Sequence, residues 1–165
     1  FSVRAARAGA AEVVAVDTSA KAHARARRNY DLSGLDPARM EQITGEASKT
    51  IERFLSRKRR FDIAICDPPT FAHGQGPGRT FSAASDLAEL AGAAGAVLEP
   101  GGLLAFASNA AKLSAGEVDK ALAEGAALRG FELRVIERQG LPPDFPVHPG
   151  FPEGNYLKFV LAVRG

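Results

Sequence analysis

Short runs of apolar and β-branched residues alternate along the chain with longer segments of helix-forming composition. The apolar runs predict strands at residues 12–17, 40–44, 61–66, 103–107, 131–138 and 155–163. The segments between them predict helices at residues 2–8, 19–32, 47–56, 83–98 and 114–129. Thr18 or Ser19 can cap the second of these helices, and Gly34 and Gly130 suit left-handed helix stops.

Strands that alternate with helices favour an α/β fold, in which a mostly parallel sheet lies between helix layers. The last two strands are joined by a proline-rich segment, residues 140–152, in place of a helix. Because such strands need no crossover, we expect them to pair antiparallel, as a hairpin at one edge of the sheet. The length of 165 residues predicts one domain over residues 1–165.

Composition and charge narrow the class of protein. Apolar residues make up 45% of the chain and charged residues 24%, which is typical of a soluble globular domain. Cys66 is the only cysteine, so an internal disulfide is excluded and a reducing, cytoplasmic location is favoured. No apolar run is long enough for a membrane span. A net charge of +2 does not indicate any particular class of binding partner. The basic clusters at residues 25–28 and 57–60 are interpreted as helix C-termini.

Polar residues follow the predicted strands at the edge where an open parallel sheet binds ligands, and we expect them to line one pocket. They are Asp17, Glu46, Asp67 and Ser108. An acid at the end of the second strand of a nucleotide-binding fold can accept hydrogen bonds from ribose hydroxyls, which is the role expected of Asp17. The alternative is an acid that merely complements a helix dipole.

The turn after the strand at 61–66 has the sharpest local pattern, Asp67-Pro68-Pro69-Thr70-Phe71. Two consecutive prolines fix the backbone and leave carbonyl acceptors without N–H donors. Those acceptors and the Asp67 carboxylate can bind the donors of a planar ring while Phe71 stacks on its face. The pattern therefore suits a nucleobase, although a plain stop between strand and loop is the alternative.

Taken together, these segments resemble the class I S-adenosylmethionine-dependent methyltransferases. More narrowly, the chain resembles the bacterial large-subunit ribosomal RNA methyltransferases of the cytosine-5 type and their guanine-N7 relatives. The resemblance is carried by residues 1–10, 14–19, 67–71, 100–104 and 152–158. It implies a Rossmann-like three-layer sandwich, S-adenosylmethionine as cofactor and 23S-type ribosomal RNA as partner, and it leaves a homodimer open.

The same resemblance assigns roles to residues of this chain. The segment of Asp17 and Ser19 is expected to bind the cofactor ribose, and Glu46 and Ala47 are expected to meet the adenine. The family usually has aspartate where this chain has Glu46, which keeps the negative charge and adds a methylene group. The turn of Asp67, Pro68, Pro69 and Phe71 is expected to face both the methyl donor and the acceptor base.

The chain departs from the family at its beginning. The first strand and the glycine-rich loop that wraps the methionine part of the cofactor are expected just before Phe1. We therefore expect an N-terminally incomplete methyltransferase domain, whose cofactor affinity is weak when it stands alone.

A second departure concerns the acceptor atom. The cytosine-5 enzymes place a nucleophilic cysteine where this chain has Asn109, and carbon 5 does not react until a thiolate adds to the ring. Cys66 is expected to be buried on the face opposite Asp67 and cannot substitute. Ser108-Asn109 resembles the Ser-Asn of the guanine-N7 relatives, so the sequence favours methylation of a base nitrogen, with Asn109 near the acceptor.

Two other functions stay open at this stage. A degenerate domain that binds RNA or a protein partner without catalysis fits the missing glycine loop and the missing cysteine. A nicotinamide-dependent oxidoreductase fits the strand pattern but leaves residues 67–71 without a role.

Several other residues are weaker candidates for a functional role. The three histidines, His23, His73 and His148, are too far apart to predict a metal site, and His23 is expected on a helix surface. The segment 72–80, with Arg79, predicts either a mobile lid or a plain loop. The proline-rich segment carries Asp144, His148 and Glu153, which either cover the substrate or hold their own loop in place.

Overall fold

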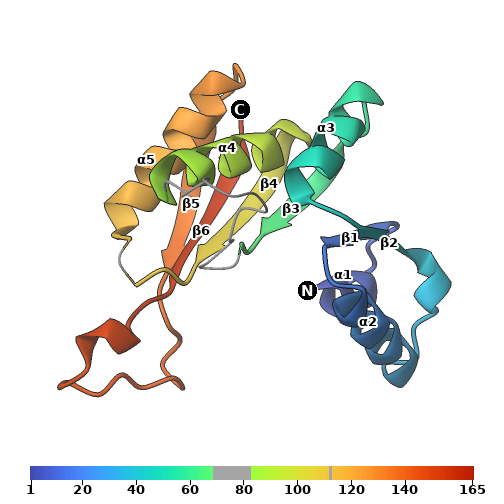
Figure 1. Ribbon diagram of the computed structural model, residues 1–165, viewed down its shortest axis with the longest axis horizontal. Helices are drawn as coiled ribbons and strands as arrows, with labels where there is room; N and C mark the ends of the chain where they lie inside the picture. Colours follow the sequence, from blue (N-terminus) through green and yellow to red (C-terminus); the bar gives the residue numbers. More distant parts are fainter. Residues whose placement is uncertain (69–82, 112) are drawn as a thin grey trace, which may run out of the picture. The chain divides into compact units, whose positions relative to one another are not determined.

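The computed structural model describes residues 1–68, 83–111 and 113–165 of the chain (Figure 1). The chain divides into two compact units, unit 1 at Phe1–Ser56 and unit 2 at Arg57–Gly165. Unit 1 has a two-stranded sheet and unit 2 a four-stranded sheet. The expectation of one domain over residues 1–165 stays a prediction.

Unit 1 consists of helices around a parallel pair of strands. Its elements are α1 (Ser2–Arg7), β1 (Val13–Asp17), α2 (Ala20–Leu32), the 3-10 helix η1 (Pro37–Arg39), β2 (Met40–Thr44) and α3 (Ala47–Ser56). Strands β1 and β2 pair in parallel, with Asp17 opposite Thr44. The buried Tyr30 of α2 donates from its hydroxyl to the carbonyl of Ser2, 3.0 Å away, and so ties α2 to α1.

The ends of α2 confirm the helix signals in the sequence. Ser19 is the N-cap, and its Oγ accepts a hydrogen bond from the N–H of Ala22 at 3.2 Å. Gly34 has a φ of +67°, a backbone conformation that residues other than glycine rarely adopt. Helix α3 has the bounds that its composition predicts.

Unit 2 contains a mixed sheet with strand order β3-β4-β6-β5. Its elements are β3 (Phe61–Cys66), α4 (Ala83–Ala96), β4 (Leu98–Ser108), α5 (Ala115–Leu128), β5 (Leu133–Gln139), η2 (Pro152–Gly154) and β6 (Lys158–Arg164). Strands β3 and β4 are parallel, and β6 is antiparallel to both β4 and β5. The predicted C-terminal hairpin is therefore confirmed, with β5 at the edge of the sheet.

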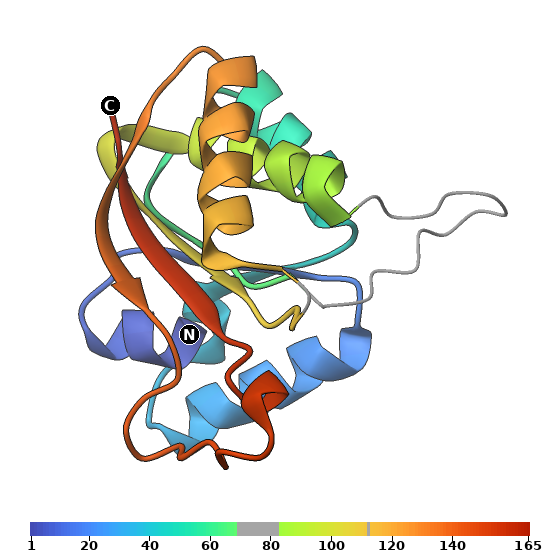
Figure 2. The same cartoon turned by 90° about the vertical axis from the view of Figure 1, so that its left-hand side faces the viewer.

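Helices α4 and α5 cover the same face of this sheet (Figures 1 and 2). The core beneath them includes the fully buried Leu104 and Phe106 of β4. Side chains of β3 alternate between faces, so that Cys66 packs against this core while Ile65 is 46% exposed. The alternation leaves Asp67, the residue after β3, exposed at the end of the strand.

Strand β4 begins five residues earlier than the sequence predicts. Leu98 pairs with Phe61, whereas Leu103 pairs with Ile63, so residues 99–102 form a bulge opposite one residue of β3. Gly101, with a φ of +82°, permits this bulge, which explains why a Pro-Gly-Gly segment lies within a strand. Helix α4 consequently ends at Ala96, two residues before the predicted end.

Of the two basic clusters interpreted as helix C-termini, residues 57–60 follow the end of α3 at Ser56, as predicted, whereas residues 25–28 do not lie at a helix end. Residues 25–28 lie in the interior of α2, where Arg27 donates to the Gln42 side chain of β2, so that interpretation is wrong for this cluster. In the second cluster, Arg60 donates to the carbonyl of Ala96 at the end of α4. This cluster therefore does satisfy a helix C-terminus, although α4 lies far along the chain from it.

Candidate functional site

In unit 1, the carboxyl ends of β1 and β2 place the residues expected to bind the cofactor. Asp17 ends β1, and its Oδ1 accepts a hydrogen bond from the N–H of Ser19 at 2.7 Å. The carbonyl of Asp17 accepts from the N–H of Gly45, 3.0 Å away, just beyond β2. Both the main chain and the carboxylate of Asp17 are thereby fixed. The carboxylate is exposed and can accept about three further hydrogen bonds.

Glu46 and Ala47 come after Gly45, just beyond the end of β2 at Thr44, and are exposed. The Glu46 carboxylate forms an ion pair with the ammonium group of Lys49 at 2.8 Å, and its carbonyl accepts from the N–H of Thr50 in α3. Residues Asp17, Ser19, Glu46 and Ala47 thus share one end of the two-stranded sheet. The structure therefore brings together the four unit 1 residues that the resemblance assigns to the cofactor.

His23 lies in a different place from the one that the sequence predicts. It is 4% exposed instead of lying on a helix surface, so this expectation was wrong. Its Nε2 lies 3.2 Å from the carbonyl oxygen of Asp17 and 3.1 Å from that of Ile43. The signal in the sequence was only its position, four residues after the cap Ser19, where a side chain can turn back toward the preceding strand.

In unit 2, the residues expected near the methyl acceptor follow two neighbouring parallel strands. Asp67 and Pro68 follow β3, and Asn109 follows β4, whose last residue is the buried Ser108. Because Cys66 pairs with Phe106 in parallel register, these residues lie at the same edge of the sheet. Pro69, Phe71 and the segment 72–80, with His73 and Arg79, lie outside the described residues.

The loop after β4 is anchored on both sides of Asn109. The N–H of Ala110 donates to Oγ of Ser108 at 3.4 Å, and its carbonyl accepts from Nζ of Lys158 at 2.7 Å. Lys158 is the first residue of β6 and pairs with Ser108. Burial lowers the pKa of the Lys158 ammonium group, and the Glu117 carboxylate opposes this shift.

Sequence reasoning missed this role of Lys158. The residue ends the segment 152–158, which carries much of the family resemblance, but the pattern gives no partner for its ammonium group. That partner, Ala110, lies 48 residues earlier in the chain. Only the antiparallel pairing of β6 with β4 brings the two together.

Cys66 has the surroundings of a structural thiol. It packs against the core of unit 2, although it is partly buried and not fully buried as expected. Burial, and then the neighbouring Asp67 carboxylate, raise the pKa of the thiol to about 12. A thiol with this pKa is protonated at neutral pH, so Cys66 has no nucleophilic thiolate.

The observation that decides the family comes from sequence comparison. Residues 1–157 match the family described as S-adenosylmethionine-dependent methyltransferase. The chain belongs to this methyltransferase family. The cofactor predicted from the sequence is therefore the one that defines the family.

Curated relatives of this methyltransferase chain are ribosomal RNA large subunit methyltransferases I. The protein of Shewanella denitrificans is 31% identical over 162 residues, which cover 98% of this chain and 40% of the relative. That of Photobacterium profundum is 32% identical over 158 residues, covering 96% of this chain and 39% of the relative. The chain thus spans about two fifths of the length of these relatives.

Solved structures of methyltransferases share the fold. A SAM-dependent methyltransferase from Streptococcus mutans aligns with a TM-score of 0.84 and 26% identity, covering 99% of this chain and 41% of that one. The methyltransferase SMU.776, complexed with SAH, aligns with a TM-score of 0.86 and 26% identity. The alignment covers 99% of this chain and 42% of that one. These similarities confirm the predicted Rossmann-like α/β class of this methyltransferase chain.

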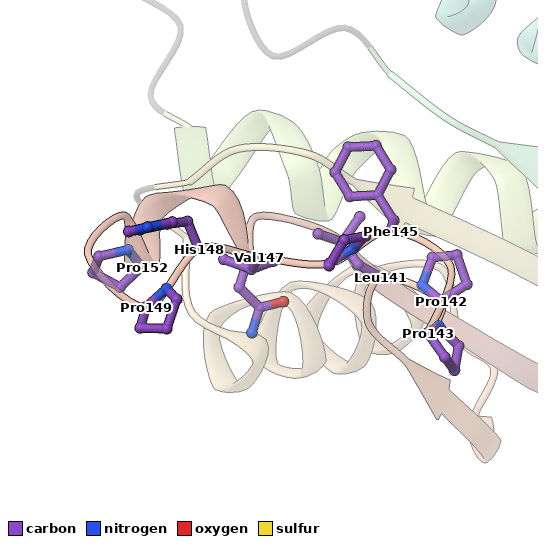
Figure 3. A pocket seen from close by; sticks show the side chains of 10 residues that line it. Leu141, Pro142, Pro143, Phe145, Val147, His148, Pro149 and Pro152 are labelled. Atoms are coloured by element: carbon purple, nitrogen blue, oxygen red, sulfur yellow. The ribbon is translucent and has the colours of Figure 1, made fainter.

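The proline-rich loop between β5 and β6 forms a hollow of about 470 Å³. Figure 3 shows His148, Pro149 and Pro152 gathered at one end of it, and Pro142 and Pro143 at the other. Nδ1 of His148 accepts a hydrogen bond from the N–H of Gly150 at 3.0 Å. Of the two roles considered for His148, this contact supports the one in which it holds its own loop in place.

Two further findings concern the described part of the methyltransferase chain. Within residues 1–68, 83–111 and 113–165, no group of three or more His, Cys, Asp or Glu side chains is arranged to hold a metal ion. None of the helices in these same ranges has the length and apolar character needed to cross a membrane.

Proposed function

We propose that the protein transfers a methyl group from S-adenosylmethionine to a base of ribosomal RNA, at a nitrogen atom and not at carbon 5 of cytosine. The observation that carries the proposal is the Asp17 carboxylate, fixed by the N–H of Ser19 at the carboxyl end of a parallel strand, in a chain of this methyltransferase family. The names of the curated relatives support ribosomal RNA as the substrate.

On the cofactor side, Asp17 accepts hydrogen bonds from the ribose hydroxyls in this proposal. The N–H of Ser19 occupies one acceptor position of the carboxylate and sets its orientation, so the remaining lone pairs are presented in a fixed direction. Glu46 and Ala47 contact the adenine from the start of α3. Their attachment to Asp17 through the N–H of Gly45 supports a joint role.

On the acceptor side, Asp67 and the carbonyl of Pro68 accept hydrogen bonds from an amino group of the target base, and Asn109 contacts the same base. Pro69 and Phe71 are proposed to complete the surface against which the base lies. Methyl transfer to a ring nitrogen needs only alignment of its lone pair with the methyl group, so rigid positioning supplies most of what the reaction requires.

The choice of nitrogen over carbon depends on the state of the thiol. Attack on carbon 5 of a pyrimidine requires a thiolate that first adds to the ring. The Cys66 thiol packs against the core with a pKa raised to about 12, and Asn109 stands after β4 where the cytosine-5 enzymes have cysteine. These observations support an acceptor atom that already carries a lone pair.

Calorimetric titration of SAH, the demethylated cofactor, tests the proposal. The protein is prepared with any residues that its gene encodes ahead of Phe1, and Asp17→Ala is compared with Asp31→Ala, an exposed aspartate of α2. We expect Asp17→Ala to weaken binding about tenfold or more, because two charge-assisted hydrogen bonds are lost. The control is expected to bind like the wild type. Absence of binding by the wild type would contradict the proposal and favour a binding module without catalysis.

A further inference from the structure

The carbonyl groups at the ends of β1 and β2 share a single side-chain donor. Nε2 of His23 lies 3.2 Å from the carbonyl oxygen of Asp17 and 3.1 Å from that of Ile43, and the residue is 4% exposed. Carbonyl oxygens only accept hydrogen bonds, so Nε2 must carry the proton that both of them share. The two contacts therefore place a ring proton of His23 on Nε2.

The same histidine is held in place through its own main chain. The carbonyl of His23 accepts a hydrogen bond from Nε2 of Gln42 in β2, at 2.9 Å. Its N–H donates to the carbonyl of Ser19, the N-cap of α2, at 3.2 Å. His23 is therefore attached to the cap of α2 on one side and to β2 on the other.

We propose that His23 is a positioning residue for the cofactor site, acting through Asp17. The Asp17 carbonyl accepts from both the N–H of Gly45 and the imidazole of His23, while its carboxylate accepts from the N–H of Ser19. Removal of the imidazole leaves two carbonyl groups without this donor and frees the end of β1 to move. The inference depends on the proposed role of Asp17 in binding the ribose.

Two substitutions separate a positioning role from simple packing. His23→Gln keeps an N–H donor at about the reach of Nε2, whereas His23→Met fills a similar volume without a donor. We expect His23→Met to weaken SAH binding about 5- to 10-fold, the loss of roughly one hydrogen bond, and His23→Gln to remain within about twofold of the wild type. Thermal unfolding of both variants measures the packing contribution, which is expected to be similar in the two.

The outcomes distinguish this inference from the proposed function. If Asp17→Ala weakens SAH binding but His23→Met does not, the positioning role is overturned and the ribose contact stands. If neither variant changes the affinity, the proposed cofactor site is itself wrong. Equal weakening by His23→Met and His23→Gln would show that packing, and not the donor, sets the affinity, and would also overturn the inference.

The wild-type protein provides a test that needs no variant to fold. Nitrogen-15 spectra of the histidine rings report which nitrogen carries the proton, and we expect the proton of His23 on Nε2. Addition of SAH is expected to shift the signals of this ring and of the Gly45 amide. A proton found on Nδ1 alone would overturn the inference, because Nε2 would then have nothing to donate.

Discussion

The thiol of Cys66 packs against the core of unit 2, whereas the next residue, Asp67, is exposed at the end of the same strand. Adjacent residues of a strand face opposite sides, so the two side chains cannot serve one reaction together. We expect Cys66→Ala to retain methyl transfer within about twofold, since no thiolate takes part. A tritium assay with ribosomal RNA measures the rate.

Alkylation of the wild-type thiol provides the control for this prediction. With a pKa raised to about 12, Cys66 is expected to react slowly with iodoacetamide in the native protein and rapidly after unfolding in urea. A variant that folds like the wild type but loses methyl transfer would contradict the assignment of a nitrogen acceptor.

Lys158 is expected to affect turnover more than cofactor binding. Its ammonium group donates to the carbonyl of Ala110 at 2.7 Å and so anchors the loop that carries Asn109. We expect Lys158→Met to lower kcat for methyl transfer about tenfold, because the acceptor base is less well aligned. SAH affinity is expected to change less than about twofold.

Lys120→Met is the matched control for this substitution. The Lys120 side chain is 73% exposed and forms a surface pair with Glu124 at 3.7 Å, an interaction that contributes little. Equal effects of the two substitutions on kcat would show that anchoring of the loop after β4 is unimportant.

The start of α5 is expected to make stability depend on acidic pH. The pKa of Glu117 is lowered from 4.5, first by the N–H of Ser114, to which its carboxylate binds at 2.7 Å, and then by the Ser114 hydroxyl. A carboxyl group whose pKa is lower in the folded state stabilises the fold above its unfolded pKa. That contribution is lost as the pH falls through the lowered value.

Thermal unfolding of the wild type and Glu117→Gln tests this dependence. At about pH 7 the wild type is expected to have the higher Tm, and the difference is expected to shrink as the pH falls below about 4.5. A difference in Tm that stays constant over this acidic range would show that ionisation of Glu117 does not stabilise the helix.

Two glycines of α5 are expected to respond in opposite ways to the same substitution. A Cβ atom at Gly125 would lie 2.1 Å from the carbonyl oxygen of Ala88 in α4, whereas a Cβ at Gly116 would meet nothing within 4 Å. Gly125→Ala is therefore expected to lower the free energy of unfolding by about 1 to 3 kcal/mol. Gly116→Ala is expected to raise it by up to about 1 kcal/mol, since alanine is the better helix former. Urea unfolding of both variants measures these changes. If the two substitutions changed the free energy of unfolding in the same direction, the close approach of α4 and α5 would be contradicted.

Local chemistry made much of the fold predictable. The hydroxyl of Ser19 caps α2, and Gly34 and Gly130, with φ of +67° and +74°, stand where the sequence predicts helix stops. These signals depend on the conformations that a few residue types adopt, so the sequence contains them. The early start of β4 was not predictable in this way, because the bulge at residues 99–102 depends on pairing with β3.

The sequence predicts which residues form the candidate site, but it does not predict the contacts that hold those residues in place. Asp17 and Asp67 each follow a strand, and in α/β folds ligands bind beyond the carboxyl ends of the strands. In unit 1 Asp17 lies at the same end of the sheet as Glu46, and in unit 2 Asp67 lies at the same end of the sheet as Asn109. The burial of His23 and the contact of Lys158 with Ala110 involve partners 20 and 48 residues away in the chain. No periodicity of the sequence reports contacts of this kind, which depend on strand pairing.

Methyl transfer to ribosomal RNA, followed by mass spectrometry of the product nucleosides, tests the central claim most directly. The wild type, Asp67→Asn and Asp62→Asn, an exposed aspartate of β3, are compared with S-adenosylmethionine as donor. We predict a nucleoside methylated at a base nitrogen, a loss of about 100-fold or more for Asp67→Asn, and little change for Asp62→Asn. No transfer by the wild type, or 5-methylcytidine as its product, would contradict the account.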